Sequence, residues 1–439
     1  MKQYSAEDIP RNATLHKFFL KTAARELMQE PHCVPRFSVT RWAITGYIAI
    51  MPETSIPAVT ARDRQVLALS LTPQLGPMRL RRLLERIPRV DEIFTASLTE
   101  LESVGLPAPA AQSIALGESL RLADEELKKL ARVEGVQLIT YGSGGYPPQL
   151  AEIYDPPLVL YVRGNAAAML ETGIAIIGTR HPTPYGLGMC ERLSQDLANC
   201  GLVIFSGMAR GIDSVAHKGA VAAHGRTVAV FGTGVDVIYP RENRKLSEQI
   251  LEQGGALVSE FPLGTGPTPH NFPLRNRIIS GLSRGVLVVE AGEYSGTRIT
   301  ARCALEQSRE VFAVPGNVTN KQAWTPNTLI KQGAKLVATW EDVFEELPTE
   351  IRLLLQARSA QLPEPQAAGL FDAAPTPGLP EEQLQIFGAI KADVSTHIDE
   401  LIERFEGRLT SSEIFTALLE LEMSNKIRQM PGKNYVRVF

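Results

Sequence analysis

Eight short apolar segments alternate with helix-like segments between Gly135 and Thr339, and this alternation constrains the fold more than any other feature. Most of these segments are apolar at every position rather than at every second one. Strands with that pattern are buried on both faces, as in a parallel sheet covered by helices. The pattern predicts a Rossmann-like, doubly wound α/β domain over residues 135–345. The expected strands are VQLITY, LVLYV, IAIIG (174–178), LVIFS (202–206), TVAVF (227–231), ALVSE, VLVVE (286–290) and VFAV (311–314).

Residues 61–134 carry a helical pattern with short loops. In LALSLTPQLGPMRLRRLLERI a Gly-Pro pair separates two apolar-periodic runs, and Pro77 suits the first turn of the second helix. The segment around Gly105 repeats this plan, which predicts a helix-hairpin-helix or SAM-like module. Such a module either binds DNA phosphates through exposed backbone N–H groups or is a packing unit with a solvated basic face. The arginines of the first hairpin are Arg79, Arg81, Arg82, Arg86 and Arg89.

The two ends of the chain differ from its centre. Residues 1–60 show no clean period, so we expect an N-terminal extension that is poorly ordered. Residues 346–380 are rich in Pro, Ala and Gln and predict a flexible linker. In residues 381–439, two helical segments precede a hairpin that turns at Pro431 and Gly432, the plan of a winged helix.

The composition of the 439 residues is that of a soluble globular protein, with 44% hydrophobic and 21% charged residues and a formal net charge of -3. The charge is uneven, because residues 341–439 hold 9 Lys and Arg against 17 Asp and Glu. The four cysteines form no CxxC pair, which disfavours a zinc site or a disulfide framework. No apolar run is long enough to span a membrane, and the N-terminus lacks a signal-peptide core. We therefore expect a cytoplasmic protein without a membrane partner.

Glycines and arginines follow several of the predicted strands at the edge where ligands bind open α/β sheets. Glycine lets backbone N–H groups approach an anion, and arginine offers a planar fork that matches phosphate oxygens. Arg275 and Arg277 are expected near a helix N-terminus, and Phe272 and Tyr185 could stack on bases. The predicted phosphate-binding residues are Gly178, Thr179, Arg180, Ser206, Gly207, Met208, Ala209, Arg210, Gly211, Phe272, Arg275, Asn276, Arg277, Gly296, Thr297 and Arg298.

Structural roles are open for several of these residues. Arg210 could pair with Asp213 at a helix start, and Glu290 could accept hydrogen bonds from neighbouring loop N–H groups. Signatures of catalysis are missing, since the chain has no GxxxxGK[ST], HExxH or GxSxG, and FGTGVD is not GxGxxG. The seven histidines show no metal-ligand spacing. We therefore expect no catalytic residues, no cofactor and no metal.

At these motifs the sequence closely resembles the DprA/Smf family of DNA-processing proteins. The resemblance covers about residues 146–338, and the helical module and winged helix also fit that family's architecture. The matching segments are YPPQLAEIYDPPLVLYVRGN, IAIIGTR, SGMARGIDSVAHKGA, VAVFGTGVDVIYPRENRKL, SEFPLGTGPTPHNFPLRNRIISGLS, VVEAGEYSGTRITA and VFAVPGNVTN.

The resemblance implies a homodimer that binds single-stranded DNA and loads the RecA recombinase during natural transformation. By the same resemblance Arg180, Arg210, Arg275 and Arg277 would contact phosphates, while Gly178, Thr179, Ser206 and Gly207 would shape the pocket and Phe272 would meet a base. Where many members have SGSLITA, this chain has Thr297 and Arg298. The added charge of Arg298 would either contact a phosphate or pair with Glu293.

Two other functions compete with this interpretation. A nucleotide hydrolase similar to the cytokinin-activating phosphoribohydrolases would need a PGGxGTxxE loop, and EAGEYSGTRITA lacks the paired glycines and the downstream Glu. A winged-helix regulator would read duplex DNA, but its expected recognition helix carries Glu413, Glu420 and Glu422, which would repel a duplex.

Overall fold

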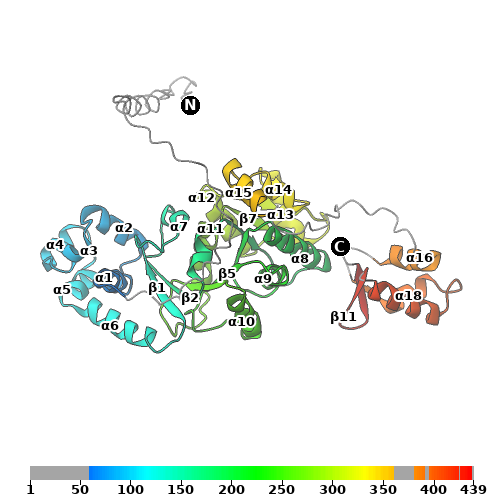
Figure 1. Ribbon diagram of the computed structural model, residues 1–439, viewed down its shortest axis with the longest axis horizontal. Coiled ribbons are helices and arrows are strands. Elements are labelled where there is room, and N and C mark those ends of the chain that lie inside the picture. Colours follow the sequence, from blue (N-terminus) through cyan, green and yellow to red (C-terminus); the bar gives the residue numbers. More distant parts are fainter. Residues whose placement is uncertain (1–58, 360–379, 391–394, 425, 438–439) are drawn as a thin grey trace, which may run out of the picture. The chain divides into compact units, whose positions relative to one another are not determined.

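One mixed sheet forms the centre of the computed structural model, which describes residues 59–359, 380–390, 395–424 and 426–437 (Figure 1). Its strands are β1 (Val136–Thr140), β2 (Val159–Gly164), β3 (Gly173–Ile177), β4 (Val203–Ser206), β5 (Thr227–Val230), β6 (Ala256–Ser259), β7 (Gly285–Val288), β8 (Glu310–Ala313) and β9 (Lys335–Leu336). They follow the order β1-β2-β6-β5-β4-β3-β7-β8-β9. The pairs from β6 to β9 are parallel, and β2 pairs with both β1 and β6 in antiparallel fashion. All eight predicted strands are confirmed, and the two-residue β9 was not predicted.

Helices connect the strands and cover the sheet. They are α7 (Pro148–Ala151), α8 (Pro184–Asn199), α9 (Ile212–Ala222), α10 (Arg244–Glu252), α11 (Asn271–Leu282), α12 (Thr297–Glu306), α13 (Trp324–Lys331), α14 (Trp340–Phe344) and α15 (Thr349–Ser359), with 3₁₀ turns η1 (Ala166–Leu170), η2 (Arg241–Asn243) and η3 (Lys321–Ala323). The helix α15 lies where we expected a linker. It forms because Leu355 packs into the core beside α8, so the predicted linker begins too early. Residues 360–379 of that prediction lie outside the described residues.

The alternation of side chains along β3 explains why the strand is apolar throughout. Ile174 and Ile176 pack into one core with residues of α8 and α9. Ala175 and Ile177 point to the other face and pack into a second core with residues of α11 and α12. Successive residues of a strand face opposite sides, so a strand covered on both faces needs apolar residues at every position.

The helices before β1 pack on the same sheet. They are α1 (Ala61–Ser70), α2 (Pro77–Arg86), α3 (Val90–Ile93), α4 (Leu98–Ser103), α5 (Ala108–Ala115) and α6 (Glu118–Leu130). Pro77 is the first residue of α2, as predicted. The core of these helices includes Tyr161 and Leu257 of the sheet. The Glu126 carboxylate of α6 also accepts a hydrogen bond from the backbone N–H of Leu263 at 2.7 Å. The boundary at residue 134 therefore stays a prediction, because the two segments share one core.

The C-terminal residues form a small helical unit with its own sheet. Its elements are α16 (Glu381–Ala389), β10 (Thr396–His397), α17 (Ile398–Arg404), α18 (Ser411–Met423), β11 (Ile427–Met430) and β12 (Asn434–Arg437). The strand order is β10-β12-β11, and Pro431 and Gly432 lie in the turn between β11 and β12, as predicted. Ile386, Leu401 and Leu418 are fully buried in its core. Residues 1–58, which include almost all of the predicted N-terminal extension, lie outside the described residues. In the described part of the chain, no helix is both long and apolar enough to cross a membrane.

Candidate nucleic-acid interface

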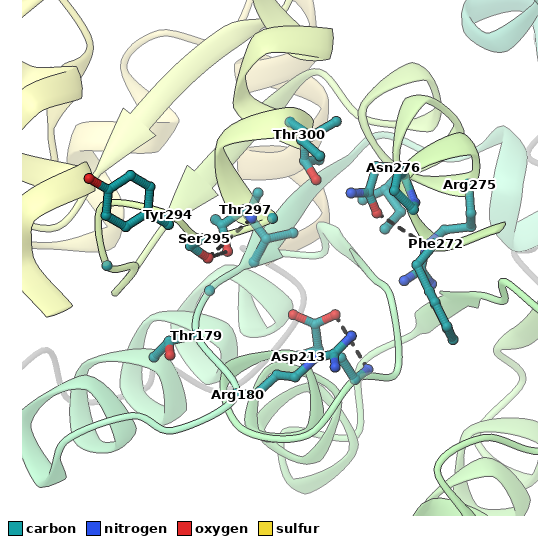
Figure 2. Close-up of a pocket in the computed structure, with 18 of the residues that line it drawn as sticks. Thr179, Arg180, Asp213, Phe272, Arg275, Asn276, Tyr294, Ser295, Thr297 and Thr300 are labelled. Carbon is teal, nitrogen blue, oxygen red and sulfur yellow. Dashed lines mark hydrogen bonds between the residues drawn. The ribbon is translucent and has the colours of Figure 1, made fainter. Parts of the chain in front are cut away.

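A cleft of about 780 Å³ opens at the carboxyl ends of β3, β4 and β7 (Figure 2). Thr179 and Arg180 line it from the loop after β3, and Asp213 from the start of α9. The N-terminal half of α11 forms the opposite wall. The loop from Gly292 to Gly296 closes a third side. The sequence thus predicted correctly that these strand ends meet around one cavity.

The loop after β3 holds Arg180 at the rim of the cleft. Gly178 fits there because a Cβ on it would lie 2.5 Å from Ile212 and 2.8 Å from the backbone oxygen of Glu290. Arg180 is exposed, and no ion pair or hydrogen bond of its guanidinium occurs among the described residues. Its Cζ atom lies 6.0 Å from the centre of the Phe272 ring.

An aromatic pair lies beside Arg180. The ring centres of Phe272 and Tyr239 are 5.6 Å apart. A small depression of about 40 Å³ adjoins the main cleft here, and Arg180, Arg210 and both rings line it. Tyr239 was missed by the sequence analysis. It lies in the segment between β5 and η2, and an aromatic residue in the segment that follows a strand end is a signal that could have found it. This is the one region of the described cleft where exposed cations and aromatic rings meet.

The loop after β4 does not offer the open amides that its glycines suggested. The carboxylate of Asp213 accepts hydrogen bonds from the N–H groups of Gly207 at 3.1 Å and Ala209 at 3.4 Å. Burial raises the pKa of Asp213, and the nearby Arg275 guanidinium opposes that rise. Gly211 has φ +74°, and a Cβ there would collide with the backbone of Thr179. The loop is therefore a rigid support whose anion position is filled by the chain's own carboxylate.

Arg275, which we predicted to contact phosphate, lines the cleft but is buried and bound to the protein's own backbone. It is 4% exposed, and Nη1 donates to the backbone oxygens of Gly207, at 2.7 Å, and of Val230. Burial lowers the pKa of Arg275 to about 10, so the side chain stays charged at neutral pH. It ties α11 to the ends of β4 and β5.

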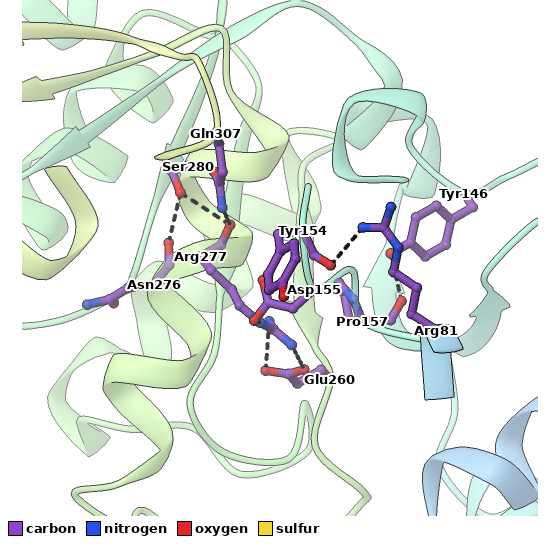
Figure 3. A network of polar contacts seen from close by, with 10 residues as sticks. All are labelled: Arg81, Tyr146, Tyr154, Asp155, Pro157, Glu260, Asn276, Arg277, Ser280 and Gln307. Carbon is purple, nitrogen blue, oxygen red and sulfur yellow. Dashed lines mark hydrogen bonds and ion pairs between the residues drawn. The ribbon is translucent and has the colours of Figure 1, made fainter. Parts of the chain in front are cut away.

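Arg277 is also buried, and the structure does not place it in the lining of the cleft, where its predicted phosphate contact would lie (Figure 3). Its guanidinium pairs with Glu260 at 2.6 Å and with Asp155 at 2.9 Å, and its side chain is 8% exposed. Because α11 begins at Asn271, both arginines lie in the second turn and not at the N-terminus. The two carboxylates already satisfy this cation.

Arg210 and Arg298 are exposed but engaged. Arg210 makes a two-pronged ion pair with Glu242, at 2.6 and 2.8 Å, and not with Asp213 as one alternative held. Arg298 donates to the backbone oxygen of Glu293 at 2.9 Å, and its Cζ atom lies 5.4 Å from the centre of the Trp324 ring. Neither cation is buried, so both can exchange these partners for a phosphate.

The loop after β7 follows the structural alternative for Glu290. Its carboxylate accepts from the N–H group of Thr183 at 2.8 Å and from the Thr183 hydroxyl at 2.6 Å. On the same side of the cleft, Ser295 donates to the Thr297 hydroxyl at 2.9 Å. Tyr294, whose role the sequence analysis also missed, projects there with 91% of its surface exposed.

The cleft brings together most, but not all, of the predicted residues. Ser206 is fully buried and donates to the Ile176 backbone oxygen at 2.6 Å. Tyr185 is half-buried, and its hydroxyl donates to the backbone oxygen of Pro315, so it does not line the cleft. The predicted residues that line the main cleft or its adjoining depression are Gly178, Thr179, Arg180, Gly207, Ala209, Arg210, Phe272, Arg275, Asn276, Gly296 and Thr297. Met208, Gly211, Arg277 and Arg298 lie outside both linings.

Comparison with known proteins identifies the family to which this chain belongs. Residues 137–348 match the family model of DNA recombination-mediator protein A, and residues 372–433 match the DprA winged helix domain. Protein Smf of Escherichia coli is 44% identical over 301 residues, which cover 69% of this chain and 77% of that protein. The chain belongs to the DprA/Smf family.

Further similarities agree with this membership of the DprA/Smf family. Protein Smf of Synechocystis is 34% identical over 396 residues, which cover 84% of this chain and 98% of that protein. The crystal structure of DNA processing protein A from Streptococcus pneumoniae superposes with a TM-score of 0.57 at 33% identity, over 65% of this chain and 98% of that one. The predicted fold class, with a Rossmann-like sheet domain and a C-terminal winged helix, is thereby confirmed.

Proposed function

We propose that this DprA/Smf protein binds single-stranded DNA in the cleft, without regard to sequence, and delivers it to the RecA recombinase. Family membership supports a role in DNA processing. The observation that carries the proposal is the placement of Arg180 over Phe272, with Tyr239 beside it. The protein would act in the cytoplasm as a homodimer during DNA uptake.

The chemistry of these three residues suits an unpaired strand. An unpartnered guanidinium can bind phosphate oxygens, and each base that stacks on an aromatic ring contributes about 1–3 kcal/mol. Rings can reach bases in this way only where the bases are unstacked, as in a single strand. Binding through phosphates and stacking reads no base edges, so it does not depend on sequence.

The described winged helix does not favour duplex readout. The helix α18 begins at Ser411, and Glu413 in its first turn accepts a hydrogen bond from the backbone N–H of the N-cap residue Thr410 at 2.7 Å. Glu420 and Glu422 lie further along the same helix. Acidic side chains on a recognition helix oppose the phosphates that flank a major groove. Loading a strand onto a recombinase breaks no bond, which agrees with a sequence that lacks the common nucleophile and P-loop signatures. We therefore propose a binding function and no enzymatic one.

The test is a titration of labelled oligothymidylate and of a hairpin duplex across a range of salt. We expect the single strand to bind more tightly, with Arg180→Ala weakening it about tenfold, as for one charged hydrogen bond. The log–log salt slope should fall by about 0.7, the share of one phosphate contact. The control is Arg121→Ala on α6, an exposed arginine paired with Glu118 and Glu125. Equal losses in both variants, or preference for the duplex, would overturn the proposal.

RecA loading and dimerisation need their own measurements. The full chain should shorten the lag in RecA ATP hydrolysis on a single strand covered by single-strand-binding protein, and Arg180→Ala should not. Sedimentation should give about twice the 48.0 kDa of one chain. An unchanged lag at saturating protein rules out loading, and a monomer at micromolar concentration rules out the homodimer.

A further inference from the structure

A row of exposed arginines lies on α2, outside the cleft. Leu80 and Leu83 face the core, while Arg79, Arg82 and Arg86 point to solvent. Positions separated by three and four residues share one face of a helix. The only acid of α2 is Glu85, which pairs with Arg81 at 3.2 Å. Among the described residues, Arg82 and Arg86 have no ion pair or side-chain hydrogen bond, so this face carries uncompensated positive charge.

This lack of partners separates α2 from several exposed arginines on other helices and loops. Arg89 pairs with Asp91 at 2.6 Å, Arg121 with Glu125 at 2.6 Å, and Arg302 with Glu306 at 2.7 Å. A basic residue that already has a carboxylate partner adds little net field to the surface. The α2 face is thus the stronger candidate for a polyanion.

An exposed aromatic ring lies next to this face. Tyr154 is 66% exposed, and the Arg81 guanidinium lies 5.9 Å from the centre of its ring (Figure 3). The same guanidinium donates to the backbone oxygen of Tyr154 at 3.0 Å, which fixes the ring against α2. An exposed ring held beside cations is the arrangement on which an unpaired base can stack.

The Tyr154 segment also contacts the wall of the cleft. Asp155 accepts a hydrogen bond from Arg277 of α11 at 2.9 Å. The neighbouring residue on α11, Asn276, lines the cleft. Figure 3 shows Asn276, Arg277, Tyr154 and Arg81 in succession from α11 to α2. The arginine face of α2 and the cleft are therefore joined by a short, ordered connection.

We infer that a single strand leaving the cleft past Asn276 runs over Tyr154 and onto the arginine face of α2 (Arg79, Arg82 and Arg86). This inference rests on the proposed binding of single-stranded DNA in the cleft. In this arrangement the function of the helical module is to bind a second segment of the same strand. It also predicts that the occupied length of DNA exceeds what the cleft alone can hold.

The test compares a short and a long oligothymidylate, of 6 and 30 nucleotides, on the full chain. In the Arg82→Glu/Arg86→Glu variant the long oligomer should bind about tenfold more weakly, with a salt slope lower by about 1.4 for two lost phosphate contacts. Affinity for the short oligomer should not change. Tyr154→Ala should weaken only the long oligomer, about fivefold, as expected for one lost stacking contact.

The matched control is Arg121→Glu/Lys128→Glu on α6, which makes the same charge change on the same module. Figure 1 shows α6 on the other side of that module from α2. If the control weakens the long oligomer as much as the α2 variant does, or if the α2 variant binds it like wild type, the inference is wrong. If wild type binds neither oligomer, the proposed function itself fails. Thermal unfolding midpoints within a degree of wild type verify that each variant is folded.

Discussion

Four of the five arginines predicted to bind phosphate divide into a buried pair, Arg275 and Arg277, and an exposed pair, Arg180 and Arg210. The buried pair lies on α11 and is satisfied by backbone oxygens or by two carboxylates. The exposed pair lies on loops at the strand ends. Arginines from the same predicted set thus have two different roles: the buried pair is structural, and the exposed pair is accessible to a ligand. The burial of a guanidinium, and not its presence in a motif, decides which.

The largest expected effect comes from removing a buried cation. We expect Arg277→Met to destabilise the fold by about 3–5 kcal/mol, because Glu260 stays buried without its partner. Burial already raises the pKa of Glu260, which shows how costly that charge is to hold. Urea unfolding measures the loss.

Substitution of the exposed Arg180 should affect stability far less than substitution of the buried Arg277. Arg180→Met should change the free energy of unfolding by no more than about 0.5 kcal/mol, as surface substitutions usually do. Adding Glu260→Gln to Arg277→Met should recover part of the lost stability, since the unpaired carboxylate is gone. If both arginine variants unfold at the same urea concentration, the division into buried and exposed pairs is wrong.

The next effect is a dependence of the protein's stability on pH, which comes from a buried histidine. His217 is fully buried, its Nδ1 atom lies 2.7 Å from the Thr227 hydroxyl, and burial lowers its pKa to about 3. The folded pKa lies below the unfolded value of about 6.5, so the unfolded chain gains a proton first as the pH falls. The contribution of His217 to the free energy of unfolding is therefore complete above about pH 6.5. It is lost between about pH 6.5 and 3, by at most about 1.4 kcal/mol per pH unit.

Carboxylates also titrate in that range, so the measurement is a difference between variants. Urea unfolding of wild type and His217→Gln from pH 7 to 4 should show a steeper decline for wild type. The control is His181→Gln, which changes an exposed histidine that lines the cleft, and its stability should decline with pH as that of wild type does. Parallel curves for wild type and His217→Gln would show that burial does not keep this histidine neutral.

The sheet was predictable because each strand carries its own signal. Strands such as β3 and β7 are apolar at every position, and that pattern depends only on local sequence. The same pattern does not distinguish the direction of pairing, so the antiparallel β2 could not be separated from its parallel neighbours. The helix α15 was missed because its buried Leu355 packs on residues far away in sequence.

The position of the cleft was predictable from the sequence, but which of the predicted arginines are free to bind a ligand was not. Strand ends must meet at one edge of a parallel sheet, which gave the right location. The state of each arginine depends on partners that sequence does not reveal: Arg277 finds Asp155 at a separation of 122 residues and Glu260 at 17. Glu290 was easier, because its partner Thr183 belongs to a loop that the sheet order places alongside it.

The smallest expected effect concerns the ion pair of Arg210 with Glu242. Both side chains are more than half exposed, at 57% and 53%, so solvent and salt screen their attraction. We expect Glu242→Gln to raise affinity for single-stranded DNA about twofold at low salt, because it frees Arg210 and removes the negative charge beside the Arg210 guanidinium. Arg210→Ala should lower that affinity by about threefold.

The double variant distinguishes a freed cation from a general change in charge. If Glu242 acts by holding Arg210, its substitution should lose part of its benefit in an Arg210→Ala background, which a double-mutant cycle measures. Both effects should shrink above about 0.3 M salt, where exposed charges are screened within a few ångströms. An additive cycle would mean that Glu242 repels DNA directly. If Arg210→Ala also left the affinity unchanged, Arg210 would belong with the structural arginines in spite of its exposure.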